Sequence, residues 1–91
     1  MKNLDLADYI GGTARLWDFS PSHDRFAVRI ESPSGETRFL ILSGCNEISA
    51  PIFWRLMRPE IRKIDDPWLE FRDATVHIVC QDVVLDVDYS A

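Results

Sequence analysis

Hydrophobic and polar residues alternate with a period of two along several segments of the chain. In residues 25–31, the apolar side chains of Phe26, Val28 and Ile30 fall on one face and charged side chains on the other. Residues 82–89 alternate in the same way, with one exception at Val84. Their apolar positions are Val83, Leu85, Val87 and Tyr89, and their acidic positions are Asp82, Asp86 and Asp88. Because successive side chains of a strand point to opposite faces, the pattern predicts antiparallel strands with one buried and one solvent-facing side.

Turn-forming residues separate the alternating segments. Ser-Pro-Ser occurs at 20–22 and again at 32–34, where proline suits the second position of a type I turn. Gly35 follows the second of these turns, and glycine readily adopts the left-handed conformation that closes a hairpin loop. The predicted strands are 13–19, 25–31, 37–42, 69–71, 75–80 and 83–89, with a further short extended piece at 61–64. The first three predict a β-meander.

Two segments lack a clear strand period. Residues 4–10 are amphipathic and end at two glycines, which predicts one or two helical turns. Residues 50–58 fit either structure, since a serine followed by a proline suits a helix start whereas their apolar positions alternate like those of a strand. The predominance of strands elsewhere favours an extended conformation for this segment.

Six or seven short strands in 91 residues predict a mainly β fold. The expected architecture is a small antiparallel β-sandwich or a partly open barrel, with one or two short helical turns. A chain of this length supports a single core and therefore one domain. Its expected parts are an N-terminal helical turn or arm (1–12), a β-meander (13–43), an irregular basic and tryptophan-containing segment (44–68) and C-terminal strands (69–91). The expected core is Leu16, Trp17, Phe26, Val28, Ile30, Phe39, Ile41, Trp54, Leu56, Phe71, Val76, Ile78, Val83, Leu85 and Val87.

The overall charge and the cysteine content restrict the class of protein. A net charge of −5 disfavours binding to nucleic acid or to an anionic membrane. No apolar run approaches the ~20 residues of a membrane span, and the first residues lack the apolar core of a signal peptide. Cys45 and Cys80 are the only cysteines, and outside a secretory context we expect both to be free thiols. These features predict a cytoplasmic protein.

The sequence contains no strong catalytic or metal-binding motif. Paired-cysteine spacing, a phosphate-binding loop and a dinucleotide fingerprint are all absent from it. His23 lies beside Ser22 and Asp24, but neighbours on a tight turn seldom reach triad geometry. His77 is expected as a half-exposed cross-strand partner for an acidic residue. The aspartates of 82–89 suit a solvated acidic face better than a cation site. We therefore expect no catalytic residue, no metal and no cofactor.

Charge is segregated along the second half of the chain. Residues 55–63 carry four basic residues and one acidic residue, a net of +3, whereas residues 64–91 carry one arginine and seven acidic residues, a net of −6. Attraction between the two segments within one molecule is the economical explanation. The alternative is an interaction surface, since arginine and tryptophan are enriched in interface hot spots. That surface would consist of Trp54, Arg55, Arg58, Arg62 and Trp68, with Asp82, Asp86 and Asp88 as a separate acidic face.

Three functional hypotheses follow from these observations. The first is a non-enzymatic protein–protein interaction or accessory module that binds another protein or a second copy of itself. The second is a small-ligand-binding β-barrel or sandwich in which Trp17, Trp54 or Trp68 lines the cavity. The third is a small enzyme that uses His77 and the C-terminal aspartates. The lack of a catalytic motif and the charge segregation favour the first hypothesis.

Overall fold

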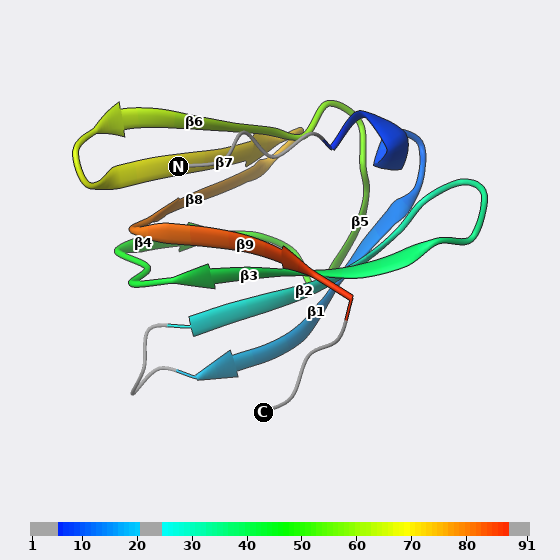
Figure 1. Cartoon of the computed structure of the whole chain (residues 1–91), viewed down its shortest axis with the longest axis horizontal. Coiled ribbons are helices and arrows are strands. Elements are labelled where there is room, and N and C mark those ends of the chain that lie inside the picture. Colours follow the sequence, from blue (N-terminus) through cyan, green and yellow to red (C-terminus); the bar gives the residue numbers. More distant parts are fainter. Residues whose placement is uncertain (1–5, 21–24, 88–91) are drawn as a thin grey trace.

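Two antiparallel sheets lie face to face around one core (Figure 1). The computed structural model describes residues 6–20 and 25–87. The first sheet has the strand order β5 (Phe53–Arg55), β1 (Thr13–Ser20), β2 (Arg25–Glu31), β3 (Thr37–Ser43) and β9 (Asp82–Asp86). The second has the order β4 (Glu47–Ser49), β8 (Val76–Cys80), β7 (Trp68–Asp73) and β6 (Glu60–Asp65). The mainly β fold and the small sandwich-like architecture are confirmed, and the described strands do not close into a barrel.

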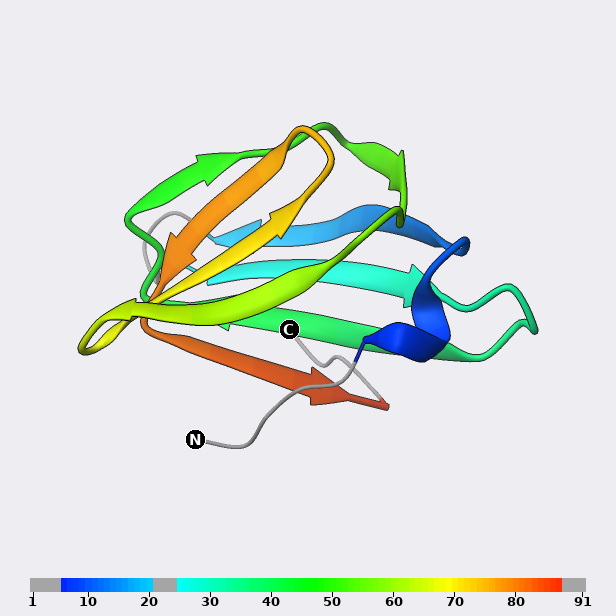
Figure 2. The ribbon, with the colours of Figure 1, turned by 90° about the horizontal axis from the view of Figure 1, so that it is seen from above.

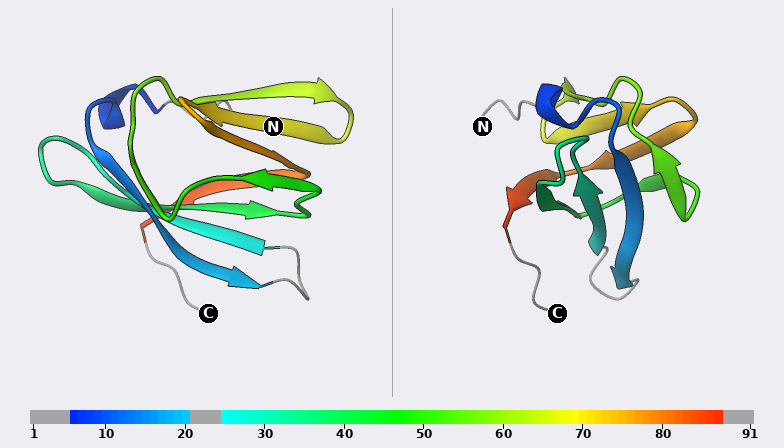
Figure 3. Two further views of the ribbon diagram at one scale, coloured as in Figure 1. Left: turned by 180° about the vertical axis from the view of Figure 1, so that it is seen from behind. Right: turned by 90° about the vertical axis from the view of Figure 1, so that its right-hand side faces the viewer.

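The chain passes repeatedly from one sheet to the other. Strands β1, β2 and β3 form the predicted meander, and the strands on either side of it, β5 and β9, come from later parts of the chain. Figure 2 shows the second sheet lying across the first, and Figure 3 shows the same two layers from behind and from the side. The first sheet is therefore complete only after β9, the last described strand, pairs with β3.

The helical content is small. The turn predicted in residues 4–10 is a single 3-10 turn, η1 (Ala7–Tyr9), and residues 1–5 lie outside the described part of the chain. Residues 53–55 of the ambiguous segment form strand β5, so the extended conformation is confirmed there. Strand β4 was not predicted, because its three residues show no distinctive period. No helix in residues 6–20 and 25–87 is long and apolar enough to cross a lipid bilayer.

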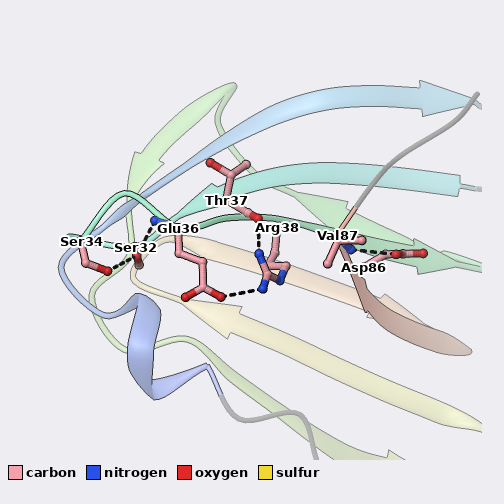
Figure 4. A network of polar contacts seen from close by, with 7 residues as sticks. All are labelled: Ser32, Ser34, Glu36, Thr37, Arg38, Asp86 and Val87. Carbon is pink, nitrogen blue, oxygen red and sulfur yellow. Dashed lines mark hydrogen bonds and ion pairs between the residues drawn. The ribbon is translucent and has the colours of Figure 1, made fainter.

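The loop between β2 and β3 has the expected turn chemistry (Figure 4). The amide of Gly35 donates to the carbonyl of Ser32 at 2.9 Å, and Gly35 adopts a φ of 96°, in the left-handed region. The Ser32 hydroxyl accepts from the Glu36 amide at 2.9 Å, and Glu36 in turn pairs with Arg38 at 2.7 Å. The loop thus closes through its own side chains. The other Ser-Pro-Ser, at 20–22, falls mostly outside the described residues.

The core consists of the inward-facing side chains of both sheets. Most of the predicted members are buried: Phe26, Val28, Ile30, Trp54, Leu56, Phe71, Val76, Ile78 and Val83. Buried residues that were not predicted include Leu6, Tyr9, Ala14 and Leu69, whereas Cys80 is buried as its place on the apolar strand face predicts. Tyr9 belongs to η1, which therefore closes one end of the sandwich over Leu40 and Phe71. Burial of the Tyr9 ring raises the pKa of its hydroxyl.

The prediction for strand β3 chose the wrong face. Leu40 and Leu42 are fully buried, whereas Phe39 and Ile41 point away from the core and are half-buried. All four positions are apolar, so the segment has no period that distinguishes its faces. The pairing with β2 decides the matter, because Val28 lies opposite Leu40 and thereby places it on the core side.

Trp17 is also outside the core, with 51% of its surface exposed. The register between β1 and β2 shifts between Leu16 and Asp18, so Trp17 is the extra residue of a β-bulge. A bulge breaks the alternation of faces and redirects a side chain. Leu16, before the bulge, remains partly buried against the core.

The C-terminal strand follows its predicted register only in part. Val83 is buried, Leu85 is half-buried against the core and Asp86 is exposed, as expected. Val87 is 61% exposed, which corrects its assignment to the core. β9 ends at Asp86, whose carboxylate accepts a hydrogen bond from the Val87 amide at 2.7 Å. Asp88 and Tyr89 lie outside the described residues.

The half-buried position of Leu85 predicts a moderate loss of stability on truncation. Leu85→Ala should cost about 1–2 kcal/mol, less than the ~2–5 kcal/mol of a fully buried leucine. Urea denaturation followed by far-UV circular dichroism measures this directly. Val84→Ala is the matched control, since Val84 faces solvent on the same strand and should change the free energy of unfolding by less than about 0.5 kcal/mol. Equal losses of unfolding free energy for both variants would contradict the assignment of Leu85 to the core face of β9.

Candidate functional site

The first sheet has a face that the second sheet does not cover. Since Phe26, Val28 and Ile30 point into the core, the alternate residues of β2 and their strand neighbours point outward. We call this surface the outer face. Its residues are Thr13, Arg15, Trp17, Asp18, Ser20, Arg25, Ala27, Arg29, Glu31, Thr37, Phe39, Ile41, Ser43, Phe53, Arg55, Asp82, Val84 and Asp86.

One row of directly opposed residues runs across all five strands of the outer face. Arg15 of β1 lies opposite both Phe53 of β5 and Arg29 of β2. Arg29 lies opposite Phe39 of β3, and Phe39 lies opposite Asp86 of β9. We call these five residues the cross-strand row. It reads aromatic, basic, basic, aromatic and acidic from one sheet edge to the other.

The aromatic and basic side chains of the outer face are in contact. The guanidinium of Arg15 lies 5.7 Å from the centre of the Phe53 ring, and that of Arg29 lies 5.8 Å from the Trp17 ring. Trp17 also packs edge-to-face on Phe39, with 5.6 Å between ring centroids. These are cation–π and aromatic geometries that hold both arginines flat against the sheet. Trp17 and Phe53 nevertheless remain about half exposed, at 51% and 52%.

The two adjacent arginines contact aromatic rings, and their positive charges lie at directly opposed positions of the sheet. Like charges directly opposite each other on a sheet are destabilising. In residues 6–20 and 25–87, no ion pair involves Arg15 or Arg29. Each arginine lies against a tryptophan or phenylalanine side chain. Arginine and aromatic residues are enriched at protein interfaces. The arrangement suits the binding of a negatively charged group between aromatic rings.

Comparisons with known proteins add no constraint. No family model, curated protein or solved structure matches this chain.

The five residues predicted as an interaction surface do not lie on one surface. Trp54 is buried, and its indole donates to the Asp73 carboxylate at 3.0 Å. Arg55 is on the outer face of the first sheet, whereas Arg62 projects from the second sheet. Arg58 lies exposed in the connection between β5 and β6, and Trp68 is half-buried at the start of β7. A joint binding role for these five residues stays a prediction.

Part of the segregated charge is paired within the molecule. Glu70, which is buried on β7, accepts from Arg62 Nε at 2.9 Å and lies 2.7 Å from His77 Nε2. Lys63 pairs with Asp66 at 3.2 Å across the turn of the β6–β7 hairpin. His77 is thus a half-exposed partner of an acidic residue, which is the role predicted from its position in the strand. The hydrogen bond from His77 first, and then the contact with Arg62, lower the pKa of the Glu70 carboxyl in spite of its burial.

This lowered pKa predicts a pH-dependent contribution of Glu70 to stability. The ionised carboxylate stabilises the fold above the unfolded-state pKa of about 4.3, and the contribution disappears as the pH falls through the lower folded-state value. Glu70→Gln should therefore lower the urea midpoint at pH 7, and its difference from the wild type should shrink below about pH 4. Glu47→Gln is the control, because Glu47 is an exposed residue of the same sheet. A difference that is constant with pH would contradict this role.

The residues of the enzymatic hypothesis are not brought together. His77 faces outward from the second sheet, whereas Asp82 and Asp86 face outward from the first, on the opposite side of the sandwich. In residues 6–20 and 25–87, no group of three or more histidine, cysteine or acidic side chains is placed to hold a metal ion. His23 and Asp88 lie outside the described residues.

The three tryptophans do not line one cavity. Trp17 is on the outer face, Trp54 is in the core and Trp68 is at the start of β7. The apolar space between η1 and the two sheets is too small to admit a water molecule. An open pocket of about 340 Å³ lies beside the β6–β7 turn, and none of the three tryptophans lines it.

Both cysteines are free thiols, as expected. Cys80 is buried on β8, and Cys45 is half-buried against the same core. The Cys45 thiol donates to the Leu42 carbonyl at 3.5 Å. A hydrogen bond with Cys45, together with burial, raises the pKa of the Cys80 thiol and keeps it protonated. Cys80 therefore behaves as a small core residue.

The sequence pattern alone does not indicate the outer face as a site. The pattern places Arg29 on the solvent-facing side of its strand, but it favours core positions for Trp17 and Phe39 and indicates no role for Arg15. The signal that was available is the cluster of arginines and aromatics in residues 13–29. Their assembly into one row depends on the strand register, which the sequence pattern does not specify.

Proposed function

We propose that this protein is a non-catalytic protein-interaction module and that its binding surface is the outer face of the five-stranded sheet. The observation that carries the proposal is the pair of directly opposed arginines, Arg15 and Arg29, flanked by exposed aromatic rings. Two like charges at directly opposed positions repel each other, and a bound carboxylate would turn that repulsion into a favourable contact with both arginines. Tryptophan and arginine also supply most of the binding energy at protein interfaces.

The outer face favours a protein partner over the other ligand classes. Neither of the two described pockets is lined by Trp17, Phe39 or Phe53, whereas small-molecule sites are concave and enclose most of their ligand. The net charge of −5 and the aspartates of β9 oppose binding to the phosphates of nucleic acid. A sheet face that carries aromatic rings and arginines, with the aspartates of β9 along one edge, suits contact with the surface of another folded protein.

A variant of the outer face tests this proposal. The double change Trp17→Ala with Arg29→Ala should abolish the enrichment of binding proteins from an extract of the source cells, measured by quantitative mass spectrometry. Circular dichroism should show an unchanged fold, because both side chains lie outside the core. Arg72→Ala is the matched control, since Arg72 is exposed on the second sheet and should leave capture unchanged. Equal capture by the wild type and the double variant would refute the proposed surface.

A further inference from the structure

One lateral edge of the five-stranded sheet is open along β5. This strand is the first in the order of its sheet, and no described strand pairs with its far side (Figure 1). Its hydrogen bonds with β1 involve every second residue. The Leu56 amide donates to the Gly12 carbonyl at 3.0 Å, and the Ile52 carbonyl accepts from the Leu16 amide at 2.7 Å. The residues between Ile52 and Leu56 determine what the open side presents.

Phe53 and Arg55 direct their backbone groups to the open side. In an antiparallel pair, residues that exchange hydrogen bonds with the neighbouring strand alternate with residues that do not. Because Ile52 and Leu56 bond to β1, Phe53 and Arg55 occupy the non-hydrogen-bonded positions of that pairing. Their N–H and C=O groups therefore point away from β1. Two amides and two carbonyls are thus presented to an incoming strand.

Exposed apolar side chains border these backbone groups. Ile48 of β4, Ile52, Phe53 and Met57 are all exposed, and Ile52 exposes 72% of its surface. All four lie between positions 48 and 57, along the same edge of the sandwich. Open sheet edges pair readily with an extended chain. An open edge with apolar groups beside it therefore suits strand addition, in which a bound peptide extends the sheet.

The charge of this edge favours an acidic partner. Residues 48–58 contain Arg55 and Arg58 and no acidic residue. Arg15 adds a further positive charge, since its guanidinium lies 5.7 Å from the centre of the Phe53 ring and is therefore close to β5. Two copies of the chain paired through β5 would bring two basic edges together, which is unfavourable. An acidic strand meets the same arginines with the opposite charge.

We infer that β5 binds an extended acidic segment of a partner protein, which joins the first sheet as an additional strand. This inference rests on the proposed function, because the added strand continues the outer face. Paired antiparallel to β5, the segment exchanges backbone hydrogen bonds with Phe53 and Arg55. Its acidic side chains lie on the outer face beside Arg55 and Arg15, and its apolar side chains lie on the other side beside Ile52. The partner segment therefore alternates acidic and apolar residues.

Two short synthetic peptides test the inference on the full chain. One peptide alternates valine with glutamate, and the other alternates valine with lysine, so both form the same kind of strand with opposite charge. In an NMR titration, the glutamate peptide should bind at least about tenfold more tightly, because its carboxylates meet Arg55 and Arg15. It should also slow the hydrogen exchange of the Phe53 and Arg55 amides, which it covers.

A charge exchange and a backbone modification identify the contact. Arg55→Glu should reverse the preference between the two peptides, and a gain in binding of the lysine peptide also shows that this variant is folded. Arg72→Glu is the matched control, since Arg72 is exposed on the second sheet and should leave the preference unchanged. Methylation of the glutamate backbone nitrogens removes the donors that face β5 and should weaken binding at least about tenfold. Methylation of the valine nitrogens, which face away from β5, should have less effect.

The outcomes separate this inference from the proposed function. Equal binding of the two peptides, or no binding of either, overturns the acidic strand partner, while protein capture that depends on Trp17 and Arg29 would still uphold the outer face as an interaction surface. Equal losses from the two methylations overturn pairing with β5. Slow exchange of the Phe53 and Arg55 amides that increases with protein concentration, without any peptide, would show that a second copy occupies the edge and also overturns the inference.

Discussion

Replacement of Asp73 by alanine should destabilise the domain by about 3–5 kcal/mol, a large part of the ~5–15 kcal/mol that separates a folded domain from its unfolded chain. Asp73 is on β7, is only 2% exposed and points into the core. Its carboxylate accepts from the Trp54 indole at 3.0 Å, from the Arg58 amide at 2.7 Å and from the Met57 amide at 3.1 and 3.2 Å. It therefore connects the second sheet to β5 and to the segment that follows β5.

The expected cost follows from the donors that would be left without an acceptor. Hydrogen bonds to charged groups contribute ~1.5–3 kcal/mol each, and a buried unsatisfied donor costs ~1–3 kcal/mol. The amides of Met57 and Arg58 are partly buried and can turn to water, whereas the Trp54 indole is enclosed. The loss should thus be smaller than the sum of the individual hydrogen bonds.

Urea denaturation followed by circular dichroism measures this effect. Asp73→Asn, which keeps one acceptor oxygen, should lose less stability than Asp73→Ala. Asp65→Ala is the matched control, because Asp65 is exposed at the end of β6 and should change the unfolding free energy by less than about 0.5 kcal/mol. A loss below about 1 kcal/mol for Asp73→Ala would show that Asp73 does not hold the two sheets together.

Gly12→Ala should also cost about 3–5 kcal/mol, for a steric reason. A Cβ atom at this position would lie 1.9 Å from the carbonyl oxygen of Glu31 and 3.0 Å from that of Tyr9. Both contacts are with backbone atoms, so no side-chain rotation relieves them. The junction between η1 and β1 would have to move, and the hydrogen bond from the Leu56 amide to the Gly12 carbonyl at 3.0 Å would be lost with it. Overpacking costs ~1–3 kcal/mol or more, and a lost hydrogen bond adds ~0.5–1.5 kcal/mol.

Thermal unfolding measures the effect and provides an internal comparison. At ~4–8 °C per kcal/mol for a domain of this size, the Tm of Gly12→Ala should fall by roughly 12 °C or more. Gly35→Ala should cost only about 1–2 kcal/mol, because a left-handed φ is unfavourable for alanine but no atom lies within 4 Å of the new Cβ. A greater loss of stability for Gly35→Ala than for Gly12→Ala would contradict the steric explanation.

Strands with true alternation were predictable from the sequence. Strand β2 occupies the predicted residues 25–31, because its apolar and charged residues alternate without interruption apart from Ala27. The sequence pattern of residues 53–55 does not distinguish a helix from a strand, since three residues are too few to show a period. Its conformation is decided by pairing with β1 in the sheet.

Three features of the structure depend on contacts between distant parts of the sequence. The apolar run of β3 has no polar side that would identify its buried face, and only its pairing with β2 selects Leu40 and Leu42. Trp17 is apolar and sits in a strand, so the pattern assigns it to the core, yet a bulge turns it outward. The cross-strand row joins residues from position 15 to position 86, and no local pattern in the sequence links them.

The pairing of β9 with β3 has a consequence for the chain while it is being synthesised. Residues 39–42 are four consecutive apolar residues with high strand propensity, and β9 is the strand that covers their open edge. Until residues 82–86 have left the ribosome, β3 is the edge of an incomplete sheet and carries no charged residue within this run to discourage pairing with another chain. A nascent or prematurely terminated chain that ends before Asp82 should therefore aggregate during translation.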